Sequence, residues 1–199
     1  MVDLGFVDPL RPIEVEMGNI KIARVDGLPR FNGGAVGYMS YEAAGYFEKL
    51  PTPKVPGLGL PESVFMFTDT LVVFDHRRHK IQVVSHMRTD GDLDAAYQEA
   101  SAKIEAVIAR LRKPLSLPRE APSSPAKGGV DSNMRPEDHA RMVAKAKEHI
   151  FAGDIIQAVV SQRFMRRTDV PPFDLYRAIR TVNPSPYMFF LDLGSFHLV

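Results

Sequence analysis

Apolar and polar positions alternate over short distances in residues 18–90. β-branched and aromatic residues form runs that end near Gly, Pro or Asp: GNIKIARV, GGAVGYMSY, SVFMFTDTLVVFD and HKIQVVSHM. Such runs are typical of strands, so we predict a β-rich region. The last two runs flank the polar sequence from Asp75 to His79, which predicts a hairpin turn. His76 and His79 would splay apart in a turn, so we do not expect them to bind a metal.

The spacing of apolar residues becomes helical after this region. Leucine, isoleucine, valine and alanine recur every three to four positions between Leu93 and Leu111. Asp92 suits the N-cap of this helix, and Pro114 marks its end.

A proline-rich stretch follows this helix. Residues 113–132 hold four prolines and few apolar side chains, which indicates a linker between domains. We therefore predict one region over residues 1–112 and a second over residues 133–199.

The second region alternates between helical and strand patterns. Pro136 suits the first turn of a helix that ends at Gly153. Another helix starts at Pro172 and must end before Pro184, because the residue before a proline avoids the helical conformation. Strands are predicted over residues 155–164, 187–193 and 196–199. The last of these would leave an unpaired apolar edge, so we expect the chain to be an incomplete fragment with sequence missing after Val199.

Composition and charge exclude several classes of function. Lys and Arg total 25 against 24 Asp and Glu, which gives no electrostatic argument for binding nucleic acid or a membrane surface. The chain has no cysteine, so it has neither a disulfide scaffold nor a thiolate metal site. No signal peptide is visible, and no apolar run reaches the roughly 18 residues of a membrane helix. A cytoplasmic location is therefore expected.

The glycine-rich sequence GGAVGY, residues 33–38, does not have the spacing of a phosphate-binding loop. It lacks the GxGxxG pattern and does not lead into a helix. We interpret its glycines as positions where two strands approach closely. The motifs GxxxxGK[ST], HExxH and GxSxG do not occur.

Residues 154–164 read DIIQAVVSQRF and have two different faces if they form a strand. One face is mostly apolar and could pack on a core. The other presents Gln157, Ser161 and Arg163. That polar face suits either solvent or the wall of a polar cavity, and the residues alone do not decide between these.

Two prolines surround a serine in NPSPYMFF, residues 183–190. Pro184 is expected to stop a helix and Pro186 to begin a strand. This local explanation accounts for both prolines without a binding site.

Three long sequence blocks, in the same order, resemble one family. GDIIQAVVSQRF is similar to the GDIFQVVLSQRF segment of anthranilate synthase component I, the large subunit that makes anthranilate from chorismate. The upstream stretches FNGGAVGYMSYEAAGYFEKLP and LPESVFMFTDTLVVFDH and the downstream NPSPYMFFLDLGSF agree as well. Ile156 and Ala158 depart conservatively from the family's usual Phe and Val.

The resemblance implies an α+β fold, an α/β sandwich of antiparallel sheets flanked by helices. Residues 1–112 would belong to the amino-terminal regulatory region, and residues 133–199 would begin the chorismate-binding domain. The chain would cover less than half of a typical subunit. The chorismate-binding glycine-serine-proline segment, the catalytic histidine and the glutamates that bind Mg²⁺ would all follow Val199, so no metal ligand is expected in this chain.

The resemblance places Gln157 near the chemistry. In the related isochorismate and salicylate synthases, a lysine at the equivalent position acts as general base on water. Ammonia is already a competent nucleophile, so a neutral glutamine that only orients it favours amination over hydration.

The resemblance also places the segment NPSPYM at a feedback site. Pro186, Tyr187 and Met188 are the positions expected to contact inhibitory tryptophan, and an aromatic ring with a thioether suits an indole. The family's second tryptophan-binding segment, near the subunit's amino end, has no match in this chain.

The expected activity is the conversion of chorismate and ammonia to anthranilate and pyruvate in tryptophan biosynthesis. A glutamine amidotransferase subunit would be the partner that supplies ammonia, and Mg²⁺ would be the cofactor. The fragment alone is expected to be inactive. Two alternatives stay open: aminodeoxychorismate synthase component I, and a noncatalytic module that binds small molecules.

Overall fold

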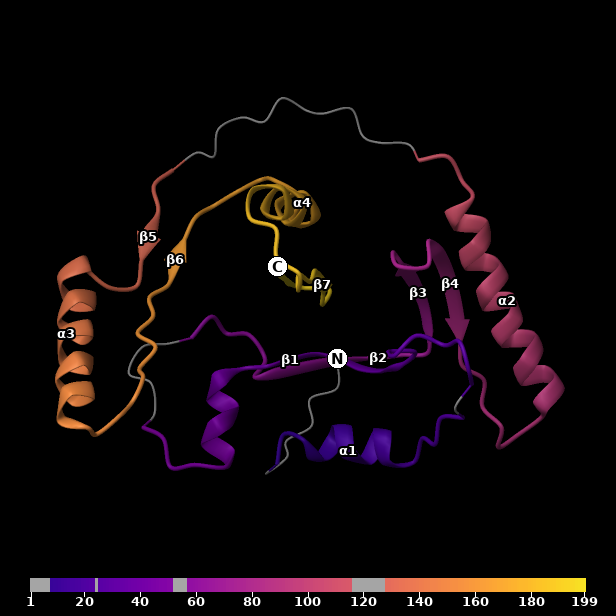
Figure 1. The fold of residues 1–199 in the computed structure, drawn as a ribbon, viewed down its shortest axis with the longest axis horizontal. Helices are drawn as coiled ribbons and strands as arrows, with labels where there is room; N and C mark the ends of the chain where they lie inside the picture. The colour runs from indigo at the N-terminus through magenta and orange to yellow at the C-terminus, as the bar shows by residue number, and fades with distance from the viewer. Residues whose placement is uncertain (1–7, 24, 52–56, 116–127) are drawn as a thin grey trace. The chain divides into compact units, whose positions relative to one another are not determined.

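The computed structural model describes residues 8–23, 25–51, 57–115 and 128–199. The chain divides into two compact units, Met1–Ser116 and Leu117–Val199, which we describe separately. Figure 1 shows the elements of both. Most of the predicted linker, residues 116–127, lies outside the described residues. The predicted division into residues 1–112 and 133–199 stays a prediction.

The first unit is built on two antiparallel strand pairs. β1 (Gly34–Met39) pairs with β2 (Ser63–Thr68), and β3 (Thr70–Asp75) pairs with β4 (Lys80–Ser85). Each pair runs in register over the full six residues of its strands. Only Asp69 separates β2 from β3, and its carbonyl oxygen accepts a 2.8 Å hydrogen bond from the amide of His86. The predicted strands in these four runs are confirmed.

The predicted turn between β3 and β4 is also confirmed. The side chain of Asp75 accepts hydrogen bonds from the amides of Arg77 and Arg78, at 3.1 and 2.9 Å. His79 closes the turn in the left-handed region, with a φ of 52°. A short polar side chain that binds the next amides is a common way to form such a turn.

Gly37 lies where β1 and β2 are closest. A Cβ atom at this position would overlap the carbonyl oxygen of Val64, and the backbone of Phe65 leaves no room for it to move. Only glycine allows the two strands to pair here. The sequence-based interpretation of GGAVGY as a close strand contact is therefore confirmed.

Helix α2 (Leu93–Leu111) packs against β4. Its predicted N-cap is confirmed, because the Asp92 side chain accepts a 3.1 Å hydrogen bond from the amide of Ala95. Lys103 of α2 lies 3.0 Å from the carboxylates of both Asp69 and Glu99. An open groove between helix and strand is lined mainly by apolar side chains, from Ile81, Val83, Ile104, Ile108, Leu111 and Arg112.

The amino-terminal part of this unit differs from the prediction. The run GNIKIARV was predicted to be a strand, which is wrong: helix α1 (Arg11–Gly18) ends at its first residue, and no strand is assigned in residues 19–23 and 25. Ile20 and Ile22 are exposed, and no described strand lies beside them. An apolar run forms a strand only where a neighbour completes its hydrogen bonds. A short 3₁₀ helix, η1 (Tyr41–Tyr46), follows β1.

The second unit contains the predicted helices. α3 (Pro136–Ala152) has proline in its first turn and ends at Gly153, whose φ of 82° makes it a left-handed C-cap. α4 (Pro172–Val182) ends before Pro184, as predicted. Both starting points and both ends are confirmed.

The predicted strands of the second unit are much shorter than expected. Residues 155–164 contribute only to β6 (Phe164–Met165), which pairs with β5 (Asp131–Ser132). Residues 187–193 contribute only β7 (Leu191–Asp192), which pairs with β8 (His197–Leu198). The long strands are wrong because no described strand lies beside their other residues. The β7–β8 hairpin itself, with Gly194 at a φ of 85° in its turn, confirms the predicted return strand.

Few side chains of the described residues are buried. Ala43, Val84 and Ala100 are the buried apolar residues among them, all in the first unit. No helix in the described ranges is both long and apolar enough to cross a membrane. The architecture is α+β, with helices and small antiparallel sheets.

Candidate functional site

Helix α4 leads directly into the predicted inhibitor segment. Asp174 in its first turn and Arg180 in its last suit the helix dipole. The amide of Asn183 donates a 2.8 Å hydrogen bond to the carbonyl of Ile179 and closes the last turn. Pro184 then prevents the helix from continuing, so the chain must turn before it reaches β7.

An aromatic cluster holds the end of α4 against the β7–β8 hairpin. The ring of Phe190 meets Phe173 edge to face, with centroids 5.3 Å apart, and lies 6.0 Å from Tyr176. The imidazole of His197 lies 5.5 Å from the same ring on its other contact. His197 is also within 3.3 Å of the carboxylate of Asp192, its cross-strand partner. Phe190 therefore fixes the carboxyl end of NPSPYMFF.

Between these two fixed ends, the predicted tryptophan-contacting residues are largely free. Tyr187 is 91% exposed, and its amide lies 3.4 Å from the hydroxyl of Ser185 as donor. Pro186 is exposed and Met188 is half-buried. The three residues are consecutive and share one short segment, with an aromatic ring that is accessible to a ligand.

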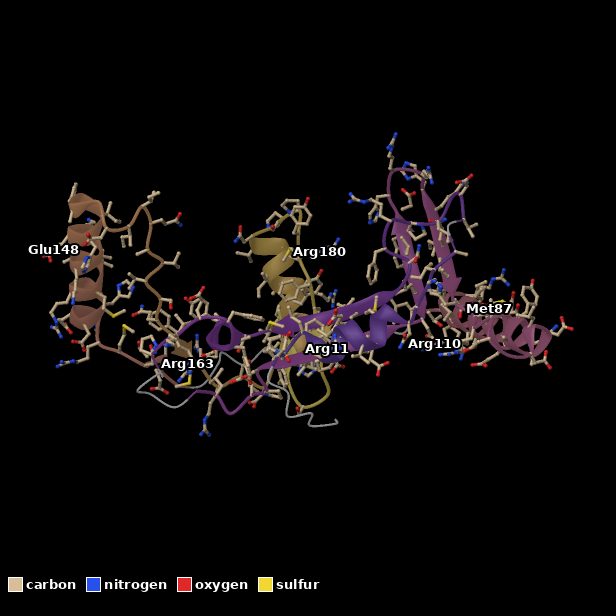
Figure 2. The ribbon with its side chains drawn as sticks, turned by 90° about the horizontal axis from the view of Figure 1, so that it is seen from below. Arg11, Met87, Arg110, Glu148, Arg163 and Arg180 are labelled. Carbon is tan, nitrogen blue, oxygen red and sulfur yellow. The ribbon has the colours of Figure 1, made fainter. Side chains whose placement is uncertain are left out.

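Gln157 lies in the segment between α3 and β6 and is exposed. The start of this segment is fixed by Asp154, whose amide donates to the carbonyl of His149 at 3.0 Å and whose carboxylate lies 2.8 Å from the imidazole Nδ1 of His149. Its end is fixed by Asn133, which bonds both the amide of Arg163 (2.8 Å) and its carbonyl (3.1 Å). Figure 2 shows Arg163 and Glu148 near the two ends.

The structure does not join the two predicted parts of the site. No hydrogen bond, ion pair or ring contact among the described residues links Gln157 to Pro186, Tyr187 or Met188. The roles assigned to these four residues stay predictions.

One hollow in the second unit was not predicted from the sequence. It has a volume of about 200 Å³ and lies at the start of α3, lined by Ser132, Met134, Pro136, His139, Gln162 and Phe164. Gln162 was assigned to the apolar face of a strand. The adjacent polar residues Ser161, Gln162 and Arg163 were the available signal that both faces are polar at this end.

The described residues offer no cluster of three His, Asp or Glu side chains that could hold a metal ion. The expectation that Mg²⁺ ligands follow Val199 stays a prediction, and no catalytic step is assigned to a metal in this chain.

The clearest electrostatic coupling lies in the first unit. The pKa of Asp69 is lowered, first by its hydrogen bond from Lys103 and then by that from Thr70. The pKa of Lys103 is raised, first by Glu99 and then by Asp69. The hydrogen bond to Glu62 raises the pKa of Tyr46. These groups connect strands to helices and are not among the candidate site residues.

Comparison with known proteins identifies the class of this chain. A family model described as chorismate binding enzyme matches residues 9–199. The chain therefore belongs to the chorismate binding enzyme family.

Particular relatives extend this assignment. The chain is 44% identical over 201 residues to a probable anthranilate synthase component 1 from Schizosaccharomyces pombe, covering 98% of this chain and 40% of that protein. It is 39% identical to anthranilate synthase component 1 from Saccharomyces cerevisiae, covering 96% of this chain and 39% of the relative. The chain thus spans about two fifths of the length of these relatives.

A solved structure confirms the predicted fold class. The crystal structure of anthranilate synthase component I from Streptococcus pneumoniae TIGR4 matches with a TM-score of 0.73 and 29% identity, over 96% of this chain and 42% of that one. The α+β prediction, and the resemblance to anthranilate synthase component I, are confirmed.

Proposed function

We propose that this chain is part of an anthranilate synthase large subunit, which converts chorismate and ammonia to anthranilate and pyruvate. The observation that carries the proposal is the 44% identity to the S. pombe relative across nearly the whole chain. In this reaction ammonia adds to a ring carbon, the ring hydroxyl leaves as water, and the enolpyruvyl group departs as pyruvate. Because the chain spans two fifths of the relatives, the activity belongs to the complete fold.

Gln157 would orient the incoming ammonia. Its exposed position between two fixed ends, at Asp154 and Arg163, leaves the amide free to reach a ligand. A neutral amide can donate and accept hydrogen bonds but cannot remove a proton at neutral pH. Water needs a general base, which typically contributes about 10²- to 10⁴-fold, whereas ammonia does not. Glutamine at this position therefore favours amination.

Tryptophan would bind against Pro186, Tyr187 and Met188 and inhibit the enzyme. The exposed Tyr187 ring and the half-buried Met188 thioether offer apolar and polarisable surface for an indole. Pro184 and Pro186 restrict the backbone, which lowers the entropy lost when the segment is ordered by a ligand. Phe190 links this segment to β7 and β8, so a bound ligand could bias the position of the hairpin.

A glutamine amidotransferase subunit would supply the ammonia, and Mg²⁺ would bind chorismate through residues outside this chain. When bound, the ion would supply positive charge next to the substrate's carboxylates. These two assignments follow from the proposed reaction.

A chimera tests the proposal. This chain replaces the matched span of the S. pombe relative, and the purified chimera is given chorismate, an ammonium salt and Mg²⁺. We expect anthranilate, detected by its fluorescence, at a rate comparable to that of the intact relative. A folded chimera that makes no anthranilate, while the intact relative does, would overturn the proposed function.

A further inference from the structure

Residues 157–163, which we call the open segment, carry the sequence of a strand without the hydrogen bonds of one. Apolar and polar residues alternate along it, and β-branched residues are frequent. None of residues 157–162 makes a backbone hydrogen bond with another described residue. In Figure 1 this part of the chain is a ribbon without an arrow between α3 and β6.

The only printed backbone partner of the open segment is at its end. Arg163 exchanges hydrogen bonds with Asn133, next to the β5–β6 ladder. In an extended strand the backbone groups of alternate residues point to opposite edges. The groups of Arg163 point to β5, so those of residues 158, 160 and 162 would point to the other edge, which no described strand occupies.

The side chains around this edge are apolar and uncovered. Ile156 is 97% exposed and Val159 is 84% exposed, on opposite faces of the extended pattern. Leaving such side chains in water forgoes roughly 1.5 to 3 kcal/mol each relative to burial. A strand that is apolar on both faces is typical of the interior of a sheet with covered faces.

The comparisons indicate what covers this edge. The solved relative matches 96% of this chain but only 42% of its own. More than half of that fold therefore lies outside the matched span and is available to pack against it. A second copy of this chain could supply only another open segment with the same unfilled edge.

We propose that the open segment forms a full strand by pairing, along the edge of residues 158, 160 and 162, with a strand from the part of the component I fold outside the matched span. The pairing would also place Gln157 at a fixed position in a sheet. This inference rests on family membership and on backbone geometry, and it does not depend on the reaction proposed above.

Amide hydrogen exchange of the chain alone and of the chimera tests this pairing. We expect the amides of residues 157–163 to exchange at least about tenfold more slowly in the chimera, because a ladder protects them from water. Unchanged exchange in a folded chimera would overturn the proposal. Slow exchange in the chain alone that depends on its concentration would overturn it too, since the partner would then be a second copy.

A pair of proline variants makes the test specific to the edge. Ala158→Pro removes an amide that would face the new partner, so we expect it to lower the melting temperature of the chimera but not that of the chain alone. Asp169→Pro is the matched control, because residue 169 is also exposed, lies outside the helices and strands, and donates no printed backbone hydrogen bond. Equal effects of the two variants on the chimera would contradict the pairing. Anthranilate production is measured separately, so a chimera that is protected but inactive would count only against the proposed function.

Discussion

The two units of this chain use similar strand sequences and reach different structures. In the first unit, β1 to β4 form two ladders of six residue pairs each. In the second unit, the strand-like runs 155–164 and 187–193 keep only ladders of two pairs. The difference lies in the partners: the strands of the first unit find theirs within the same unit, whereas most of the open segment has no described neighbour.

This difference shows which part of strand formation is local. A run of β-branched residues favours the extended conformation, but its amides and carbonyls need partners before the strand is stable. The hairpin β3–β4 supplies its own partner through a turn of a few residues. The open segment requires a partner from elsewhere, so its pattern alone was not sufficient.

The largest predicted effect would break the first unit's ladder. Gly37→Ala would place a methyl group against the carbonyl of Val64 and force β1 and β2 apart. We expect a loss of roughly 3 kcal/mol in the free energy of unfolding, measured by urea denaturation of the chain. Gly45→Ala is the control, because a Cβ there meets no atom within 4 Å. Similar losses for both variants would show that the close approach at Gly37 is not what requires glycine.

The second prediction concerns the open segment's function. Gln157→Lys in the chimera would introduce a general base where a neutral amide stands, so water addition should compete with amination. We expect isochorismate or salicylate to appear and anthranilate formation to fall about tenfold. Products are separated by chromatography after incubation with chorismate and ammonium. The absence of any hydration product in a folded variant would count against the role assigned to Gln157.

The third prediction compares an exposed tyrosine from each unit. Tyr187→Ala in the chimera should raise the tryptophan concentration needed for half-inhibition by about tenfold, because the indole would lose an aromatic contact. Tyr41→Ala removes a similarly exposed ring from the first unit and should leave inhibition unchanged. Both variants are assayed for anthranilate formation over a tryptophan titration. Equal shifts would mean that the predicted segment is not specific.

The smallest expected effect is a pH dependence in the first unit. The folded-state pKa of Asp69 is lowered, so its stabilising contribution is present above its unfolded pKa, near about 3.9, and is lost as the pH falls through the folded value. That of Lys103 is raised, so its contribution is present below its unfolded pKa, near about 10.4, and is lost as the pH rises through the folded value.

Removing this pair should change stability only slightly, because both side chains are solvent-exposed. We expect Asp69→Asn to lower the melting temperature by a few degrees at most at neutral pH and to have no effect at a pH where Asp69 is protonated. Asp90→Asn is a useful control: its partner Arg88 is two residues away, so that pair can persist in the unfolded chain. A larger pH dependence for Asp90→Asn would contradict the argument that Asp69 connects separate elements.

Local signals in the sequence were sufficient for the helices, their caps and the hairpins. Asp92, Pro136 and Gly153 act on the backbone within a few residues, so their effect does not depend on the rest of the fold. The same holds for the turn at Asp75 and for the stop at Pro184. The positions of Gln157 and Tyr187 on connecting segments could be read from the same signals, and their roles came only from the family resemblance.

The tertiary structure decided what depends on contacts between distant residues. The sequence by itself determined where helices begin and end, which runs favour extended backbone, and the family to which the chain belongs. It did not determine that GNIKIARV lacks a strand partner, that Gly37 faces Val64, or that Phe190 packs against both Phe173 and His197. The physical reason is that caps and turns satisfy their own hydrogen bonds locally, whereas a strand or a ring contact is stable only when a partner from elsewhere is in place.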